Sequence, residues 1–249
     1  ITAVIVAGLP HGALDPLVAR NIGIIRKKLD WLRFSVIYLA QALAAFFIWV
    51  WQPEIALVTF LLLSVWHFSE DWENNLPRFG RALGGISIII FPAYFHMPEV
   101  NQIFSWLGLA INDSVYVRLL TYLGPPFILI YLLFCVLNIK HHPWGCLELI
   151  CIFIVAMIAS PLMFFVIYFC ILHSPRHFVK TINSLHIALP TVLLVAFIFS
   201  GAAIALVLFI VIITGEELVT KILTQAIFIG LFSLTVPHMI LVRKSIKQA

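Results

Sequence analysis

The sequence predicts an all-α fold, a bundle of transmembrane helices with about eight or nine spans. Three observations lead to it: 63% of the 249 residues are hydrophobic, only 10% are charged, and the mean hydropathy is +1.09. Soluble globular domains contain about 25% charged residues. Because a spanning helix needs roughly 20 apolar residues, about eight or nine spans fit in the chain, and we expect residues 1–249 to form one integral-membrane domain.

Apolar runs bounded by charged residues or prolines locate the expected spans in order. The second and third runs meet at Gln52-Pro53-Glu54, and the sixth and seventh meet at Ser160-Pro161, so both connections are expected to be tight turns between antiparallel helices. The first run begins at Ile1, so we expect further residues upstream, and no signal-peptide pattern precedes His11. The expected spans are residues 1–14, 34–51, 54–70, 82–96, 117–137, 145–159, 161–178, 187–213 and 222–242.

Basic residues gather in alternate loops between these spans. Of the 15 lysines and arginines, all except Arg118 and Lys221 fall in one set of loops and the C-terminal tail. Cytoplasmic loops carry an excess of lysine and arginine, so this set and the C-terminus are expected to be cytoplasmic. An arrangement with eight spans would misplace several of these charges. We therefore interpret the excess of basic over the 11 acidic residues as topology information, and not as a surface for nucleic acid.

Four of the nine histidines share one expected depth. His11 ends the first span, His67 ends the third, and His173 and His177 close the seventh. The loop charges place all four toward the cytoplasmic side, on three different helices. Imidazole suits iron, zinc, copper and nickel, and ligands from several helices can enclose an ion while leaving positions open for a reactant. The sequence therefore predicts a metal site at these four histidines.

A competing explanation exists for each of these histidines taken singly, because a histidine can also cap a helix end or bond a backbone carbonyl at the membrane interface. Four histidines at one membrane depth favour a metal site over four separate structural roles. His173 and His177 are four residues apart, which puts both rings on one face of a helix. Pro175 lies between them and predicts either a kinked continuous helix or a new helix that starts at Ser174-Pro175.

Two further polar residues flank this site. His238 lies inside the ninth expected span, where it is either a satisfied core histidine, a residue that supports a ligand, or a fifth ligand. Asp15 follows His11 by four residues. It either bonds that ring, as carboxylates often do at metal-bound histidines, or is a loop acid ahead of Pro16.

The other polar and aromatic residues receive ordinary roles. Glu70 and Asp71 follow His67 by three and four residues, and they either bond a ligand histidine or, as the sequence favours, belong to a solvated loop with Glu73. Arg176 either orients a carboxylate or, as is favoured, is a cytoplasmic anchor. The 21 phenylalanines, 7 tryptophans and 6 tyrosines fit the membrane core and its interfacial belt, and some of them can line an apolar tunnel. The remaining histidines are expected to be solvated or interfacial: His96, His141, His142 and His186.

The motifs around the histidines resemble those of the Brp/Blh family of bacterial and archaeal β-carotene 15,15′-dioxygenases. The resemblance covers essentially the whole chain, in four blocks that follow the order of that family. One departure is Ser69, which stands where the family often has glycine, so we transfer no role to the two acids after it. The blocks are Gly8-Leu9-Pro10-His11-Gly12-Ala13-Leu14-Asp15, His67-Phe68, Tyr168-Phe169-Cys170 with His173-Ser174-Pro175-Arg176-His177-Phe178, and Leu234-Thr235-Val236-Pro237-His238-Met239-Ile240-Leu241.

The resemblance implies an all-helical enzyme of a bacterial or archaeal cytoplasmic membrane, with a non-haem Fe(II) held by His11, His67, His173 and His177. It also implies central cleavage of β-carotene with O2 to give two molecules of retinal, and a functional link to a retinal-binding rhodopsin. It assigns no catalytic residue beyond the metal ligands and no substrate-binding residue.

Two other functions stay open at the level of sequence. A membrane carotenoid or lipid hydroxylase with two irons needs more histidine motifs than the chain offers, since only His173/His177 and His141-His142 resemble them. A non-enzymatic carotenoid or lipid transporter is contradicted by nothing, but acids in the middle of spans, suited to ion coupling, are lacking. A rhodopsin is disfavoured because no lysine falls inside an expected span.

Overall fold

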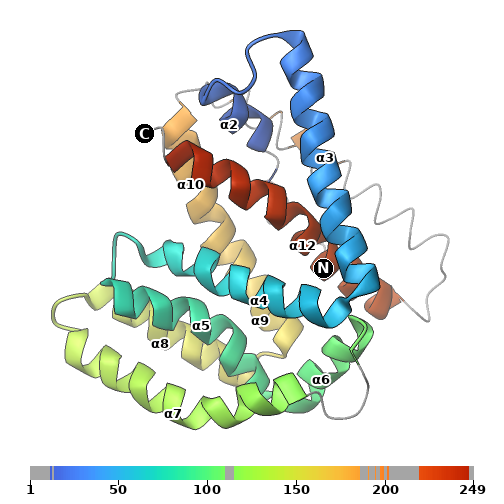
Figure 1. Ribbon diagram of the computed structural model, residues 1–249. Helices are drawn as coiled ribbons and strands as arrows, with labels where there is room; N and C mark the ends of the chain where they lie inside the picture. The colour runs from blue at the N-terminus through green and yellow to red at the C-terminus, as the bar shows by residue number, and fades with distance from the viewer. Residues whose placement is uncertain are drawn as a thin grey trace. The chain divides into compact units, whose positions relative to one another are not determined.

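The computed structural model describes residues 14–109, 115–185 and 219–246, with single positions at 12, 190, 194, 197, 198 and 201. These residues are helical with connecting turns, and no strand occurs among them, which confirms the all-α class. The chain divides into two compact units (Figure 1). Unit 1 comprises Ile1–Ala56 and Ser174–Ala249, and unit 2 comprises Leu57–His173. That residues 1–249 form one catalytic domain stays a prediction.

Unit 1 is built around two long helices that pack against each other, α3 (Lys28–Trp51) and α12 (Val219–Ile246). Trp49 and Phe232 meet edge to face between them, with ring centroids 5.2 Å apart. The short helix α2 (Asp15–Asn21) lies beside α12 (Figure 1) and also contacts α10 (Ser174–Leu185). Leu17 supports the second contact, since it belongs to a cluster against which Phe178 packs.

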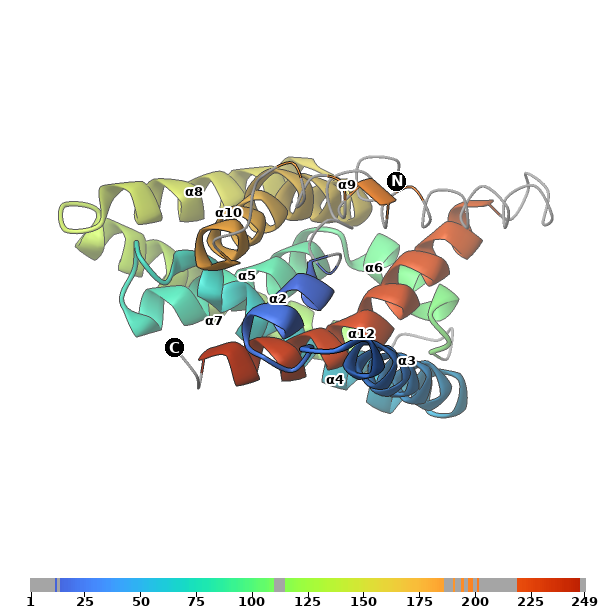
Figure 2. The ribbon, with the colours of Figure 1, turned by 90° about the horizontal axis from the view of Figure 1, so that it is seen from above.

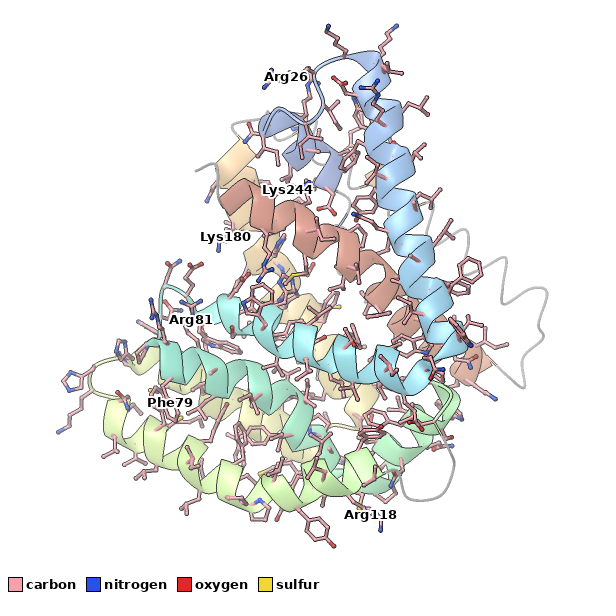
Figure 3. All side chains as sticks on the ribbon, in the orientation of Figure 1. Arg26, Phe79, Arg81, Arg118, Lys180 and Lys244 are labelled. Carbon is pink, nitrogen blue, oxygen red and sulfur yellow. The ribbon has the colours of Figure 1, made fainter. Side chains whose placement is uncertain are left out.

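The turn between α2 and α3 explains where α3 begins. Gly23 has a φ of 74°, a left-handed conformation that glycine adopts without strain. Oδ2 of Asp30 then accepts hydrogen bonds from the backbone N–H groups of Arg26, at 3.1 Å, and Lys27, at 2.9 Å. These amides precede the first helical turn, and the acid also suits the positive end of the helix dipole. Arg26 marks this turn in Figure 3.

Unit 2 packs around α5 (Arg78–Phe95), which contacts both α7 (Val115–Asn138) and α8 (Pro143–Ile158) and runs beside them in the view from above (Figure 2). Phe91 of α5 meets Tyr131 of α7 and Phe153 of α8 edge to face, with ring centroids 4.9 and 5.2 Å apart. The buried Tyr131 hydroxyl donates to the carbonyl of Leu149 at 2.8 Å. The elements of this unit are α4 (Pro53–Ser69, which begins in unit 1), η2 (Glu70–Trp72), α5 (Arg78–Phe95), α6 (Met97–Trp106), α7 (Val115–Asn138), α8 (Pro143–Ile158), α9 (Pro161–Ile167) and the π-helix η3 (Tyr168–His173).

Glycines in α5 let neighbouring elements approach closely. A Cβ atom at Gly85 would collide with the carbonyl oxygen of Val65 in α4, and one at Gly84 would collide with the indole of Trp72. Trp72 is fully buried as a result. Because Asp71 precedes it in the 3-10 turn η2, the fit of Trp72 against Gly84 holds that turn in place.

Four described helices are long and apolar enough to cross a membrane: residues 28–51, 115–138, 161–183 and 220–244. The number of candidate spans among the described residues rises to five if α5 and α6, which meet at a bend of 106°, form one broken span. The expected eight or nine spans are not confirmed, because α4 and α8 have only 17 and 16 residues. The expected spans at 1–14 and 187–213 lie almost wholly outside the described residues.

Candidate functional site

Unit 2 brings two of the expected ligands together. His67 lies near the end of α4 and His173 ends the π-helix η3, and their ring centroids are 4.9 Å apart at an interplanar angle of 81°. Both residues are buried, with exposed fractions of 6% and 1%. Two imidazoles at this separation and away from solvent form a pair that can share one ion.

A carboxylate for which the sequence favoured a solvated loop holds one of these rings. Nδ1 of His173 lies 3.0 Å from Oδ2 and 3.1 Å from Oδ1 of Asp71, whose side chain is 6% exposed. The Tyr168 hydroxyl donates to the same Oδ2 at 2.5 Å. The expectation of a solvated acid is therefore wrong for Asp71. Asp71 is the neighbour of Glu70 in the sequence, but the 3-10 turn Glu70–Trp72 directs the carboxylate of Asp71 into the interior.

The π-helix explains how Tyr168 and His173 reach one acceptor. They are five residues apart, and in an α-helix of 3.6 residues per turn side chains at that spacing point about 140° apart. A π-helix bonds residue i to residue i+5, which brings the two over each other. Their rings are accordingly stacked, with centroids 6.0 Å apart and planes at 27°. Neither of the two arrangements expected around Pro175 included this turn, although proline commonly disturbs the helical turn before it.

Aromatic rings enclose this pair. Phe68 packs edge to face against His173, with centroids 4.8 Å apart, and against Tyr168, at 5.1 Å. Trp72 stacks on Tyr168 at 6.5 Å. These rings restrict water at the histidine pair and hold the tyrosine that bonds Asp71.

Unit 1 contains a second arrangement of the same chemistry. Nδ1 of His238 in α12 lies 2.8 Å from Oδ1 of Asp15, the first residue of α2. The Tyr38 hydroxyl from α3 donates to Oδ2 of the same carboxylate at 2.7 Å. The side chains of His238 and Asp15 are only 5% and 3% exposed. Three helices thus converge on one buried carboxylate.

His177 of α10 lies next to His238, with ring centroids 5.1 Å apart. Thr181, one turn further along α10, places its hydroxyl oxygen 3.3 Å from Nδ1 of His177. Each unit therefore holds a pair of neighbouring imidazoles, and one ring of each pair is bonded through Nδ1 to a carboxylate.

These residues fit a metal by the chemistry of their donors. Metal-bound histidines commonly donate one ring N–H to a carboxylate, which fixes the tautomer and leaves the other nitrogen to the ion. In both His173 and His238 the carboxylate engages Nδ1, so Nε2, which is buried in each, is the nitrogen that can ligate. Imidazole ligands suit iron as well as zinc, copper and nickel.

The other sequence candidates are located as follows. His11 lies outside the described residues, and so does its contact with Asp15, which was one of two alternatives for that acid. Asp15 is a buried partner of His238, and sequence spacing gave no signal for Tyr38. His96, expected at the interface, places Nε2 3.0 Å from the carbonyl oxygen of Ala156 at the end of α8. The turn residue His141 is exposed.

Comparison with known proteins supports the motif resemblance. A family model described as β-carotene 15,15′-dioxygenase matches residues 2–244. A protein named β-carotene 15,15′-dioxygenase, from uncultured marine bacterium 66A03, is 31% identical over 262 residues, which cover 97% of this chain and 91% of that relative. No solved structure matches. With a match over nearly its whole length, the chain belongs to the β-carotene 15,15′-dioxygenase family.

Proposed function

We propose that this protein is a membrane enzyme that cleaves β-carotene with O2 at its central double bond. The carbon–carbon double bond breaks, two aldehyde groups form, and one O2 per β-carotene supplies the two oxygen atoms that two molecules of retinal need. The observation that carries this proposal is the family match across residues 2–244, which includes every histidine of the four motif blocks.

The cofactor is a non-haem Fe(II), with His11, His67, His173 and His177 as its ligands. Supporting this set, His67 lies beside His173 within unit 2, and His177 lies within a second histidine pair in unit 1. Bound iron supplies the redox chemistry that lets O2 react with a closed-shell polyene. The protein itself orients the rings, through Asp71 on His173, and excludes water around them, through Phe68 and its neighbours.

The protein works in the cytoplasmic membrane of a bacterium or archaeon, with its four candidate histidine ligands toward the cytoplasmic side. The four long apolar helices and the basic loops support this placement. β-Carotene dissolves in the bilayer, so an enzyme embedded there meets its substrate directly. The retinal released is the chromophore that a retinal-binding rhodopsin in the same membrane would take up.

Expression in bacterial cells that make β-carotene tests the activity. We expect retinal to appear, identified by chromatography, and purified protein to contain about one iron per chain. The double variant His173→Ala/His177→Ala should lose retinal formation, whereas His141→Ala, which changes an exposed turn histidine, should retain it. Normal retinal formation by the double variant would overturn the ligand assignment.

The same experiment separates the competing functions. Hydroxylated carotenoids and two irons per chain would indicate a hydroxylase. Bound carotenoid without any oxidised product or bound metal would indicate a transporter. Aldehydes longer and shorter than retinal would show cleavage away from the central double bond.

A further inference from the structure

One three-residue arrangement occurs twice among the residues that the structure describes. In each case a carboxylate accepts a hydrogen bond from a tyrosine hydroxyl and another from Nδ1–H of a histidine. In unit 2 the three residues are Asp71, Tyr168 and His173, with separations of 2.5 Å to the hydroxyl and 3.0 Å to the ring. In unit 1 they are Asp15, Tyr38 and His238, with separations of 2.7 and 2.8 Å.

The two arrangements have different backbone origins. Tyr168 and His173 come from one π-helical turn and Asp71 from a 3-10 turn. In unit 1 each member comes from a different helix: α2, α3 and α12 supply Asp15, Tyr38 and His238. No local sequence pattern is shared, so what the two have in common is the orientation of an imidazole by a carboxylate that is itself held by a tyrosine.

This chemistry is what a histidine ligand requires. A carboxylate at Nδ1 fixes the tautomer, points the Nε2 lone pair away from the acid, and makes that nitrogen more basic. The tyrosine hydroxyl fixes the carboxylate in turn. A histidine that only satisfied a buried carbonyl would need neither the charge nor the second donor.

A second imidazole stands next to the oriented ring in each case. His67 lies 4.9 Å from His173, and His177 lies 5.1 Å from His238, centroid to centroid. Nitrogen ligands lie about 2.0–2.1 Å from metals such as zinc. Two imidazoles on one such ion come to a similar separation. His177 is a ligand in the proposed set, and His238 relates to it as His173 relates to His67.

We propose that His238 is a metal ligand together with its neighbour His177, and that Tyr38 with Asp15, and Tyr168 with Asp71, are positioning residues for His238 and His173. The inference rests on the proposed function, because it takes the metal from there. It adds a ligand that the motif-based set lacks and assigns roles to two tyrosines and to an acid that spacing alone did not select.

Metal affinity, and not turnover, tests the inference. Purified protein is stripped of metal, and Fe(II) or Co(II) is titrated back in competition with a coloured chelator. Asp15→Asn and Asp71→Asn should each weaken affinity by roughly 10–100-fold, as is usual when the carboxylate behind a ligand is changed. His238→Ala should weaken it at least as much. Tyr38→Phe and Tyr168→Phe should give smaller losses, up to roughly tenfold.

The d–d spectrum of the Co(II) form gives a second readout, because its intensity and position follow the number and geometry of the ligands. His238→Ala should change this spectrum, and Tyr38→Phe should shift it less. Tyr122→Phe is the matched control, since Tyr122 is 77% exposed on α7. It should leave both affinity and spectrum as in the wild type.

A purely structural role predicts a different result. The tyrosine and aspartate variants would then lower the melting temperature while metal affinity and the Co(II) spectrum stayed unchanged, and the inference would be overturned. The inference would also be overturned if the His238→Ala variant bound metal with the affinity and the Co(II) spectrum of the wild type. If the wild type binds no metal at all, the proposed function itself fails, a result distinguishable from both of these.

Discussion

Nδ1 of His238 lies 2.8 Å from Oδ1 of Asp15, although 223 positions separate the two residues in the chain. The bond joins the first turn of α2 to α12, and the Tyr38 hydroxyl brings α3 to the same carboxylate. The three residues form one small polar network around a buried carboxylate. Such networks are stabilising only when every member has its partner.

Asp15→Ala tests that network. The substitution removes the acceptor of two donors, and a buried donor left unsatisfied costs about 1–3 kcal/mol. We therefore expect the free energy of unfolding of metal-free protein to fall by about 2 kcal/mol or more, seen as a lower melting temperature in detergent. Glu99→Ala, at an acid whose side chain is 52% exposed, serves as the control. Equal melting temperatures for the two variants would contradict the prediction.

Gly84→Ala tests the fit that holds Asp71. The added methyl group would meet the indole of Trp72, and overpacking of this kind costs about 1–3 kcal/mol. Because Trp72 follows Asp71, metal affinity should fall as well as stability. Gly230→Ala, where nothing lies within 4 Å of the new Cβ, should be neutral or slightly stabilising in its helix. Similar losses in both variants would show that packing at Trp72 is not the cause.

Changes in chain length within η3 test the role of the π-turn. Insertion of one alanine after Cys170 puts Tyr168 and His173 out of register with their shared carboxylate. Deletion of Ile171, whose side chain is 72% exposed, leaves the two residues four apart, a spacing that an α-helix keeps on one face. Metal titration should therefore show a much larger loss of affinity for the insertion than for the deletion. The reverse order would exclude this account of the turn.

Cysteine labelling tests the membrane orientation inferred from the loop charges. Arg81 and Arg118 mark opposite ends of the helices in unit 2 (Figure 3). We expect Val115→Cys, near Arg118, to react with a membrane-impermeant maleimide in intact cells. Asn74→Cys, in the loop before α5, should react only after the cells are opened. Both positions are exposed, and the wild type with its four cysteines gives the background. Labelling of Asn74→Cys alone in intact cells would invert the orientation.

Most helix boundaries could be predicted because proline and charge end the apolar runs. The expected span 145–159 is helix Pro143–Ile158, and 54–70 is Pro53–Ser69. The short helices α2 and α6 were not predicted, since neither is long enough to give a span-like apolar run. Hydropathy alone does not fix the number of spans, because it cannot tell whether α5 and α6, which meet at a bend of 106°, form one broken span.

Histidines of the candidate site were predictable, but what holds them was not. His67 and His173 stood out because a histidine at the end of an apolar run is costly without a partner. Asp71 lies 102 positions from His173, and its local composition, between Glu70 and Glu73, is typical of a solvated loop. Tyr38 lies in an ordinary apolar helix. Contacts between residues so far apart in the chain depend on tertiary packing, and the spacing of residues in the sequence does not reveal that packing.

The two carboxylates behind the histidines also bear on the electrostatic balance of each histidine pair. Neutral imidazoles alone would leave a bound divalent ion with its full positive charge, and burying an uncompensated ion costs several kcal/mol even after the protein relaxes. The side chains of Asp15 and Asp71 are only 3% and 6% exposed, and each accepts from the histidine of its own unit. Within each unit, the carboxylate would therefore face positive charge that the ring passes on from an ion, in a place that water hardly reaches.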